Sequence, residues 1–215
     1  LAMSSHNADP LLARLERAPI VPLISEDDPA RAVDVALALK AGGLCVVEVV
    51  LRSENALAGL AAIRRADESL TVGAGTVLTL EHLDAARENG AQFIVSPGLV
   101  DALVERSLRC DLPILPGTMT AGEVQRAYAL GLRAVKFFPA LQSGGVPMIK
   151  TLATVFRDMR FMPTGGVSAS NLADFLALPS VLACGGSWLT PKGAEPAAIE
   201  ALAREALAIA TRVRG

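Results

Sequence analysis

The chain has 215 residues, of which 52% are hydrophobic and 20% are charged, and its formal net charge at pH 7 is −2. This length suits one globular domain with a sizeable core. The near-neutral charge, with a single Trp and a single Tyr, argues against a nucleic-acid partner, and no apolar run approaches the roughly 18–20 residues that span a membrane.

The N-terminus comes before any expected element. Leu1 and Ala2 stand before Met3, and we expect these two residues to be a cloning remnant. No positively charged segment is followed there by an apolar one, so we expect no signal peptide.

Short apolar runs typical of buried strands recur at intervals of about 20–25 residues, each followed by a helical pattern. The runs occupy residues 20–24, 45–51, 71–76, 93–98, 113–117, 134–140, 160–166 and 181–187. Helical patterns include residues 29–40, closed by Gly42 and Gly43, residues 56–65, and residues 80–89, closed by Gly90. Eight strands alternating with eight helices predict an α/β fold with a parallel sheet.

At this length the alternation favours a single closed (β/α)₈ barrel, the TIM barrel, over residues 1–215. An open doubly wound sheet is the alternative. No linker, low-complexity run or charge block divides the chain, so we expect one domain.

Cysteines and histidines bear on compartment and metal binding. Cys45, Cys110 and Cys184 are an odd, widely spaced set without a C-x-x-C motif, which indicates a reducing, cytoplasmic setting. His6 and His82 are the only histidines and have no partner at metal-ligand spacing, so we expect no metal site.

The carboxyl ends of the strands are where a barrel places its active site. Glu48, Val50 and Arg52 share one face of their run because side chains alternate along a strand, and Lys136 and Phe138 share a face in the same way. The other run ends supply Thr76, Pro97 and Thr164, and the two lone threonine hydroxyls, like Phe138, are by themselves more typical of structural positions.

Glycine pairs follow the seventh and eighth runs. Gly165 and Gly166 end one, and Gly186 with Ser187 ends the other. Each alone is typical of a tight turn, but these two loops often hold a phosphate through backbone N–H groups, so together they favour a phosphate site. Ser168 is expected to cap the helix that follows.

Lys136 is the least expected residue of its run, because lysine is almost never fully buried unless it is paired or used. The other lysines, Lys40, Lys150 and Lys192, lie in helix-like or loop-like segments. Lys136 paired with Glu48 in a structural network is one explanation of its place in a strand, and an internal pair of Glu48 with Arg52 is another structural possibility.

The chemical explanation joins these groups. An amine is nucleophilic only when unprotonated, and apolar walls and a nearby guanidinium both disfavour the ammonium form. Such a lysine forms a Schiff base with a keto group, Glu48 is the acidic candidate for proton transfer, and Arg52 suits the substrate's anionic end. The pattern therefore predicts a metal-free carbon–carbon lyase acting on a phosphorylated 2-oxo acid.

Six segments then resemble one family in its order along the chain, from Pro19 to about Trp188. They are V-V-E-V-V-L-R, V-G-A-G-T-V-L, F-I-V-S-P-G, K-F-F-P-A, P-T-G-G-V-S and G-G-S-W-L. They resemble the bacterial 2-keto-3-deoxy-6-phosphogluconate (KDPG) aldolases of the Entner–Doudoroff pathway, which also act on 4-hydroxy-2-oxoglutarate. The resemblance implies a cofactor-free class I aldolase that yields pyruvate and glyceraldehyde 3-phosphate, and a cytoplasmic homotrimer.

The resemblance also implies a role for each matched residue. Lys136 would be the Schiff-base lysine and Glu48 the proton-transferring residue. Arg52 and Thr76 would hold the pyruvate carboxylate. The remaining roles are pocket lining by Pro97, Phe138 and Thr164, and a phosphate cradle of Gly165, Gly166, Gly186 and Ser187.

One residue departs from the family pattern, and three other functions stay open. Val50 stands where the family leads us to expect Thr, which bears on secondary substrates. The nearest alternative is an aldolase for the C4 epimer, 2-keto-3-deoxy-6-phosphogalactonate, which assays of both epimers would separate. A non-covalent phosphosugar isomerase or epimerase would not depend on Lys136, and a non-catalytic phosphosugar-binding barrel would show no turnover.

Overall fold

The computed structural model describes residues 10–215. The expected cloning remnant, Leu1 and Ala2, lies outside the described residues, as does His6. The N-terminal segment for which no signal peptide is expected also falls largely outside them.

One eight-stranded parallel sheet is the centre of the fold. Its strands are β1 (Ile20–Ile24), β2 (Val46–Val50), β3 (Thr71–Gly75), β4 (Ile94–Ser96), β5 (Ile114–Thr118), β6 (Ala134–Phe137), β7 (Arg160–Pro163) and β8 (Cys184–Gly186). Neighbours run in the order β7-β6-β5-β4-β3-β2-β1-β8. Bridges from Phe161 to Val181 and from Thr164 to Gly185 join the two edges. The predicted barrel is confirmed, and the open doubly wound sheet is wrong because no free edge separates β7 from β8.

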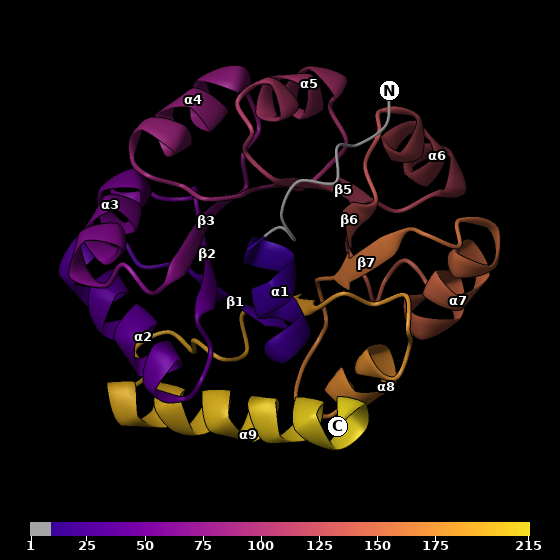
Figure 1. Ribbon diagram of the computed structural model, residues 1–215. Helices are drawn as coiled ribbons and strands as arrows, with labels where there is room; N and C mark the ends of the chain where they lie inside the picture. The colour runs from indigo at the N-terminus through magenta and orange to yellow at the C-terminus, as the bar shows by residue number, and fades with distance from the viewer. Residues whose placement is uncertain (1–9) are drawn as a thin grey trace.

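Helices form a ring around the barrel (Figure 1). They are α2 (Pro29–Ala41), α3 (Ala56–Ala66), α4 (Leu80–Glu88), α5 (Asp101–Arg109), α6 (Ala121–Ala129), α7 (Gly145–Val155), α8 (Leu172–Leu176) and α9 (Pro196–Arg214). The predicted helices agree with α2, α3 and α4 to within a residue at each end. Gly43 (φ 96°) and Gly90 (φ 91°) adopt the left-handed conformation just beyond α2 and α4, as expected of helix stops.

Several predicted strands are longer than the observed ones. The run 181–187 begins three residues before β8, and the two runs that follow here extend beyond their strands at the carboxyl end. The run 134–140 ends as a strand at Phe137, and the run 160–166 ends at Pro163. The extra residues include Pro139, which has no N–H to donate to a ladder, and Gly165 and Gly166, which have positive φ, so these segments form loops at the barrel mouth instead.

An additional helix, α1 (Pro10–Arg17), closes the opposite end of the barrel. It lies at the centre of the ring in Figure 1, and its Leu11 and Leu15 pack in one buried cluster with interior residues such as Val21, Val46 and Phe93. No sequence pattern predicted this helix. Leu11 and Leu15 are four residues apart, the spacing that puts two side chains on one face of a helix.

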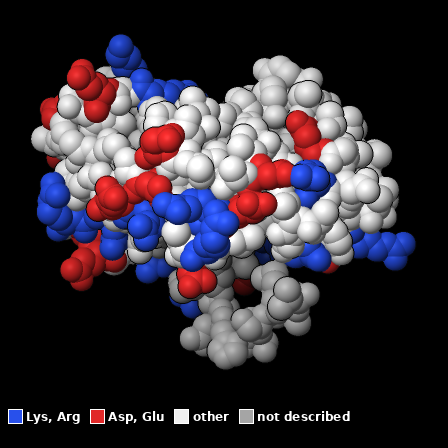
Figure 2. All heavy atoms as spheres, turned by 90° about the horizontal axis from the view of Figure 1, so that it is seen from above, with Lys and Arg blue, Asp and Glu red and all other residues white. Residues whose placement is uncertain are grey.

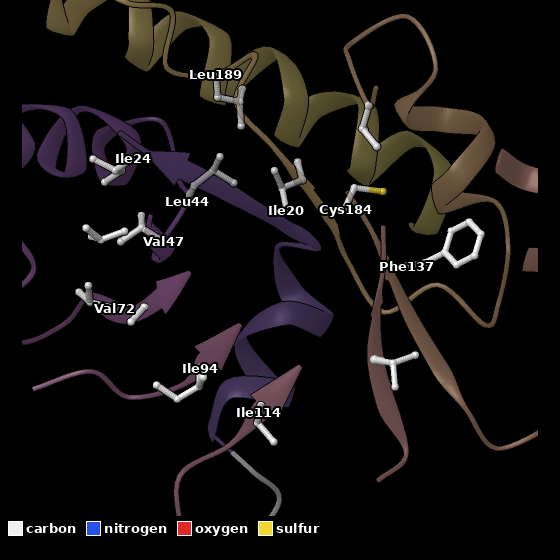
Figure 3. Packing of buried hydrophobic residues seen from close by; sticks show 14 of the residues in the cluster. Ile20, Ile24, Leu44, Val47, Val72, Ile94, Ile114, Phe137, Cys184 and Leu189 are labelled. Carbon is white, nitrogen blue, oxygen red and sulfur yellow. The ribbon is translucent and has the colours of Figure 1, made fainter. Parts of the chain in front are cut away.

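A larger apolar cluster lies between the sheet and the outer helices (Figure 3). Its strand residues alternate with the interior ones, so that Val47 and Val49 of β2, and Val135 and Phe137 of β6, belong to it. The residues between them, Glu48 and Lys136 among them, must therefore face the barrel interior.

Acidic and basic side chains are interspersed on the face formed by the helices at the top of Figure 1 (Figure 2). Arg106 of α5 binds Asp84 of α4 through two bonds of 3.0 and 2.7 Å, and Arg126 of α6 binds Asp101 of α5. These hydrogen bonds lower the pKa of both carboxyl groups. Exposed pairs of this kind contribute little stability, so they mainly align neighbouring helices.

The helices of residues 10–215 include none with the length and hydrophobicity that crossing a membrane requires.

Loss of the α1 plug should weaken the whole barrel. We expect Leu15→Ala to lower the free energy of unfolding by about 2–5 kcal/mol, the usual effect of removing a fully buried leucine. Urea denaturation measures the change. Leu12→Ala, at an exposed position of the same helix, is the control and should cost less than about 1 kcal/mol. Equal losses in both variants would show that α1 does not seal the interior.

Candidate active site

Two oppositely charged side chains meet inside the barrel. Glu48 comes from the middle of β2 and Lys136 from β6, and their exposed side-chain fractions are 1% and 6%. The Lys136 Nζ lies 3.6 Å from Glu48 Oε1. It also makes a cation–π contact with the Phe138 ring, 5.2 Å from the ring centroid. The pairing of Lys136 with Glu48 is therefore observed. An ion pair of Glu48 with Arg52 is absent among the described residues.

Glycine on β3 makes room for the carboxylate. A Cβ on Gly75 would lie 2.0 Å from Glu48 Oε1, and one on Gly73 would lie 2.3 Å from the Phe93 ring. Gly73 is the register partner of Glu48, and the Phe93 ring takes the space that a side chain at Gly73 would fill. A side chain at Gly75 would displace Glu48, and one at Gly73 would displace the Phe93 ring.

Neither carboxylate oxygen of Glu48 accepts a hydrogen bond from residues 10–215, although both are buried. Buried carboxylates are usually paired and hydrogen-bonded, because an unsolvated charge is costly. A carboxylate left with one ion-pair partner and free lone pairs can instead exchange a proton with a molecule that enters the barrel.

Arg52 and Thr76 form a polar pair at the rim of the mouth. Arg52 Nε donates to Thr76 Oγ1 over 3.2 Å, and the guanidinium is exposed. Thr76 has a φ of 59°, a conformation that costs energy in a β-branched residue and that is often found at functional sites. The pair presents a guanidinium and a hydroxyl to an incoming anion.

The loop after β4 bends over the interior beside Lys136. Ser96 Oγ donates to the Gly98 carbonyl over 2.8 Å, which holds the turn at Pro97. The Pro97 carbonyl oxygen lies 2.0 Å from where a Cβ on Gly117 would be, and Gly117 is the register partner of Lys136. Pro97 is half-buried at the mouth, as is Phe138 at the end of β6.

Thr164 and two glycine loops complete the mouth on the far side. Thr164 is buried, and its Oγ1 lies 2.4 Å from where a Cβ on Gly185 would be. Gly165 and Gly166 follow with φ values of 97° and 78°. Gly186 is also close-packed, since a Cβ there would overlap the Trp188 ring.

The backbone of these loops leaves N–H groups available. The Gly165 carbonyl accepts from Leu141 N over 3.0 Å, and the Gly166 carbonyl accepts from Asn171 Nδ2 over 2.9 Å. In the described part of the chain, the N–H groups of Gly166 and Ser187 make no hydrogen bond. Such free N–H groups on adjacent loops suit an anion.

Ser168 does not cap the following helix, contrary to the prediction. Asn171 is at the N-cap position of α8, and the Ser168 N–H donates to Asn171 Oδ1 over 2.9 Å. A turn of three residues separates Ser168 from the helix, so its hydroxyl bonds to Ser170 instead.

The predicted site residues thus gather at one end of the barrel. Glu48, Lys136 and Thr164 lie deep, and the remaining ones surround the mouth: Arg52, Thr76, Pro97, Phe138, Gly165, Gly166, Gly186 and Ser187. The roles of Gly75 and Gly117 were not predicted from the sequence. Glycine inside a strand pattern is a signal of close approach, and it marks both positions.

No metal centre is evident at this site. Residues 10–215 contain no group of three or more His, Cys, Asp and Glu side chains placed to hold a metal ion. Burial raises the pKa of the Cys184 thiol, which keeps it protonated and unreactive.

Comparisons with known proteins agree with this geometry. A family model described as "KDPG and KHG aldolase" matches residues 11–202. A 2-dehydro-3-deoxy-phosphogluconate aldolase of Pseudomonas aeruginosa is 44% identical over 213 residues, which cover 94% of this chain and 96% of the relative.

Two solved structures share the fold closely. The 2-keto-3-deoxy-6-phosphogluconate aldolase of Zymomonas mobilis ZM4, crystallised with 3-phosphoglycerate, superposes with a TM-score of 0.88 at 43% identity, covering 94% of this chain and 97% of its own. The KDPG aldolase of Legionella pneumophila has a TM-score of 0.88 at 33% identity, covering 91% and 97%. Its crystal holds pyruvate captured at low pH as a covalent carbinolamine intermediate.

A side chain at Gly75 should disable Glu48 without unfolding the barrel. Gly75→Ala forces the carboxylate away from its place, and we expect solvent exchange of pyruvate methyl protons to slow by roughly 10- to 100-fold. Glu48→Gln should slow it at least as much. Gly98→Ala is the control, because a Cβ there meets nothing within 4 Å. Unchanged exchange in Gly75→Ala would mean that the position of Glu48 does not matter to proton transfer.

Proposed function

The chain belongs to the KDPG and KHG aldolase family, and from this we propose that it is a class I aldolase whose Schiff base forms on Lys136. It is a carbon–carbon lyase that cleaves 2-keto-3-deoxy-6-phosphogluconate to pyruvate and glyceraldehyde 3-phosphate and also acts on 4-hydroxy-2-oxoglutarate. The observation that carries the proposal is the buried Lys136 amine, 3.6 Å from a carboxylate that lacks other partners among the described residues.

The reaction begins at Lys136. The amine must be unprotonated to attack, and Glu48 is the base beside it that can take its proton. Nζ adds to C2 of the substrate, and loss of water leaves an iminium. A base then takes the proton of the C4 hydroxyl group, the C3–C4 bond breaks, and its electron pair moves toward the iminium to give an enamine and the free aldehyde.

Glu48 carries the protons in this scheme. Protonation of the enamine at C3 gives the iminium of pyruvate, and addition of water releases pyruvate and restores the Lys136 amine. Because the iminium is itself the electron sink, the mechanism requires neither a metal nor a cofactor.

Arg52 and Thr76 bind the carboxylate of the substrate. A guanidinium fork matches a carboxylate in geometry and charge, and the Thr76 hydroxyl, which accepts a bond from Arg52, can donate its own proton to the same anion. The left-handed backbone at Thr76 supports this role, since strain at a strand end is kept where function requires it.

The phosphate lies at the other side of the mouth. The free N–H groups of Gly166 and Ser187 support a cradle that also includes Gly165 and Gly186. Pro97, Phe138 and Thr164 line the space between the two anionic ends of the substrate and keep water from the iminium.

The chain acts as a single aldolase domain, a cytoplasmic enzyme and a homotrimer. The outer face of α7 supports self-association. Met148 is 38% exposed, and Val155, seven residues on, is 71% exposed. Leu141, in the preceding loop, is 53% exposed, and Lys150 is the one charged residue of α7. An uncharged apolar face of this kind is typical of an interface.

Reduction with borohydride tests the Schiff base. Incubation with pyruvate and borohydride should fix a covalent adduct on Lys136 alone, as read by mass spectrometry of peptides. Lys136→Ala should abolish both labelling and cleavage, and Lys136→Arg should fail as well, because a guanidinium stays protonated. Chelators should have no effect. Labelling of Lys40, Lys150 or Lys192, or activity that survives in Lys136→Ala, would overturn the mechanism.

A negative charge at position 187 tests the phosphate cradle. We expect Ser187→Glu to raise KM for the phosphorylated substrate at least about tenfold through repulsion, with little change for 4-hydroxy-2-oxoglutarate. Ser187→Ala is the control, since it keeps the backbone N–H. Gly166 is less suitable, because its positive φ and the contact of a Cβ with Leu141 would disturb the loop. Equal changes for both substrates in Ser187→Glu would argue against a phosphate at this loop.

Light scattering tests the trimer. Val155→Lys together with Met148→Lys should shift the measured mass from trimer to monomer, because two ammonium groups would enter an apolar contact. Leu108→Lys, at a half-exposed position of α5, is the control and should leave the mass unchanged. A monomeric wild type would refute the trimer, and a trimer that survives both substitutions would place its interface elsewhere.

A further inference from the structure

Thr118 is a buried polar residue that the proposed mechanism does not use. It is the last residue of β5, and only 1% of it is exposed. Its register partner on β6 is Phe137, whereas Gly117 is opposite Lys136. Register partners of parallel strands point to the same side of the sheet. Thr118 therefore points with Phe137 toward the outer helices, where a substrate inside the barrel cannot touch it.

Two hydrogen bonds connect Thr118 to the backbone around the lysine. Its Oγ1 donates to the carbonyl oxygen of Lys136 over 3.1 Å, and its own carbonyl accepts from the Phe138 N–H over 3.0 Å. One residue thus holds both peptide groups that flank Phe137. Because the hydroxyl is buried, water cannot replace its partner, and the bond persists.

Beyond the ladder bonds that pair β5 with β6, strand β5 gives the Lys136 side chain little packing. Its register partner Gly117 has no side chain to pack against it, and the Pro97 carbonyl fills the interior space there. Strand β6 ends one residue later, at Phe137, and Pro139 has no N–H to extend the ladder. The hydrogen bond from the Thr118 hydroxyl to the Lys136 carbonyl thus lies on the outer side of the sheet, next to the end of β6.

We propose that Thr118 is a positioning residue for the reactive lysine: by holding the Lys136 carbonyl from outside the barrel wall, it fixes the direction of the side chain toward Glu48 and the keto carbon. The inference rests on the proposed role of Lys136. Small errors in the placement of a nucleophile are costly in rate, and they leave ground-state contacts with the substrate unchanged.

Variants that differ by one hydroxyl group test the proposal. Thr118→Ser and Thr118→Ala lose the same methyl group, and only Thr118→Ser keeps the donor. The readout is the rate constant for borohydride-trappable imine formed with pyruvate in a single turnover. We expect Thr118→Ser to stay within about twofold of wild type, and Thr118→Ala to be slower by roughly 3- to 30-fold. Thr118→Val, which keeps the volume, should be slow as well, so loss of folding in one variant leaves the other informative.

Two controls separate positioning from a general loss of structure. Binding of 6-phosphogluconate, which has the carboxylate and phosphate but no keto group, should be unchanged in every variant. Thr71→Val removes another buried barrel hydroxyl, from β3, and should keep the wild-type imine rate. The inference is overturned if Thr118→Ala and Thr118→Ser form imine equally fast, or if Thr71→Val is slowed as much. Failure of wild type to be labelled at Lys136 would instead refute the proposed function.

Discussion

The close approach of strands to one another around a buried ion pair is the constraint on which the site depends. Lys136 and Glu48 project into a barrel whose interior is otherwise filled by side chains. Glu48 fits because Gly75 of β3 leaves its space open, and the glycines in register with the pair, Gly73 and Gly117, leave space for the Phe93 ring and the Pro97 carbonyl. A side chain at Gly75 would overlap Glu48, and one at Gly117 would overlap the Pro97 carbonyl. The glycines are therefore as necessary to the site as the charged residues.

The two ends of the barrel serve opposite purposes. At the amino end α1 buries Leu15 against the interior residues and excludes water from below. At the carboxyl end four of the strands, β3, β4, β7 and β8, stop at or just before a proline or a glycine, and the chain continues into loops. The interior is consequently apolar beneath the ion pair and polar above it. A carboxylate without hydrogen-bond donors is tolerated at this boundary because a molecule entering from the mouth can supply them.

The carboxyl-end loops keep unfavourable features that a merely stable protein would lose. Thr76 has positive φ, and the Gly166 and Ser187 N–H groups lack partners among residues 10–215. Each feature leaves a group unsatisfied or strained at the mouth, on opposite sides of the ion pair. This arrangement suits a substrate with a carboxylate at one end and a phosphate at the other, with its keto carbon between them at Lys136.

The barrel and the residues at its mouth were predictable from the amino-acid sequence. Strict alternation of apolar runs and helical patterns admits few folds, and the period of two within each run places Glu48 and Lys136 on interior faces. The assigned role of each site residue stays a prediction. Sequence periodicity did not reveal α1, because an eight-residue helix with two buried leucines four residues apart is too short a signal without the barrel end that it fills. The preference of serine for N-cap positions predicted the cap of α8 at Ser168. This was wrong because the sequence could not show that a turn separates Ser168 from the helix. Which groups touch could be seen only in the folded protein: the 3.6 Å between Lys136 and Glu48, the overlap that excludes a side chain at Gly75, and the Thr118 bond to the lysine carbonyl. These contacts join residues about 20 to 90 positions apart, and their distances depend on strand register and barrel closure, which local sequence preference does not encode.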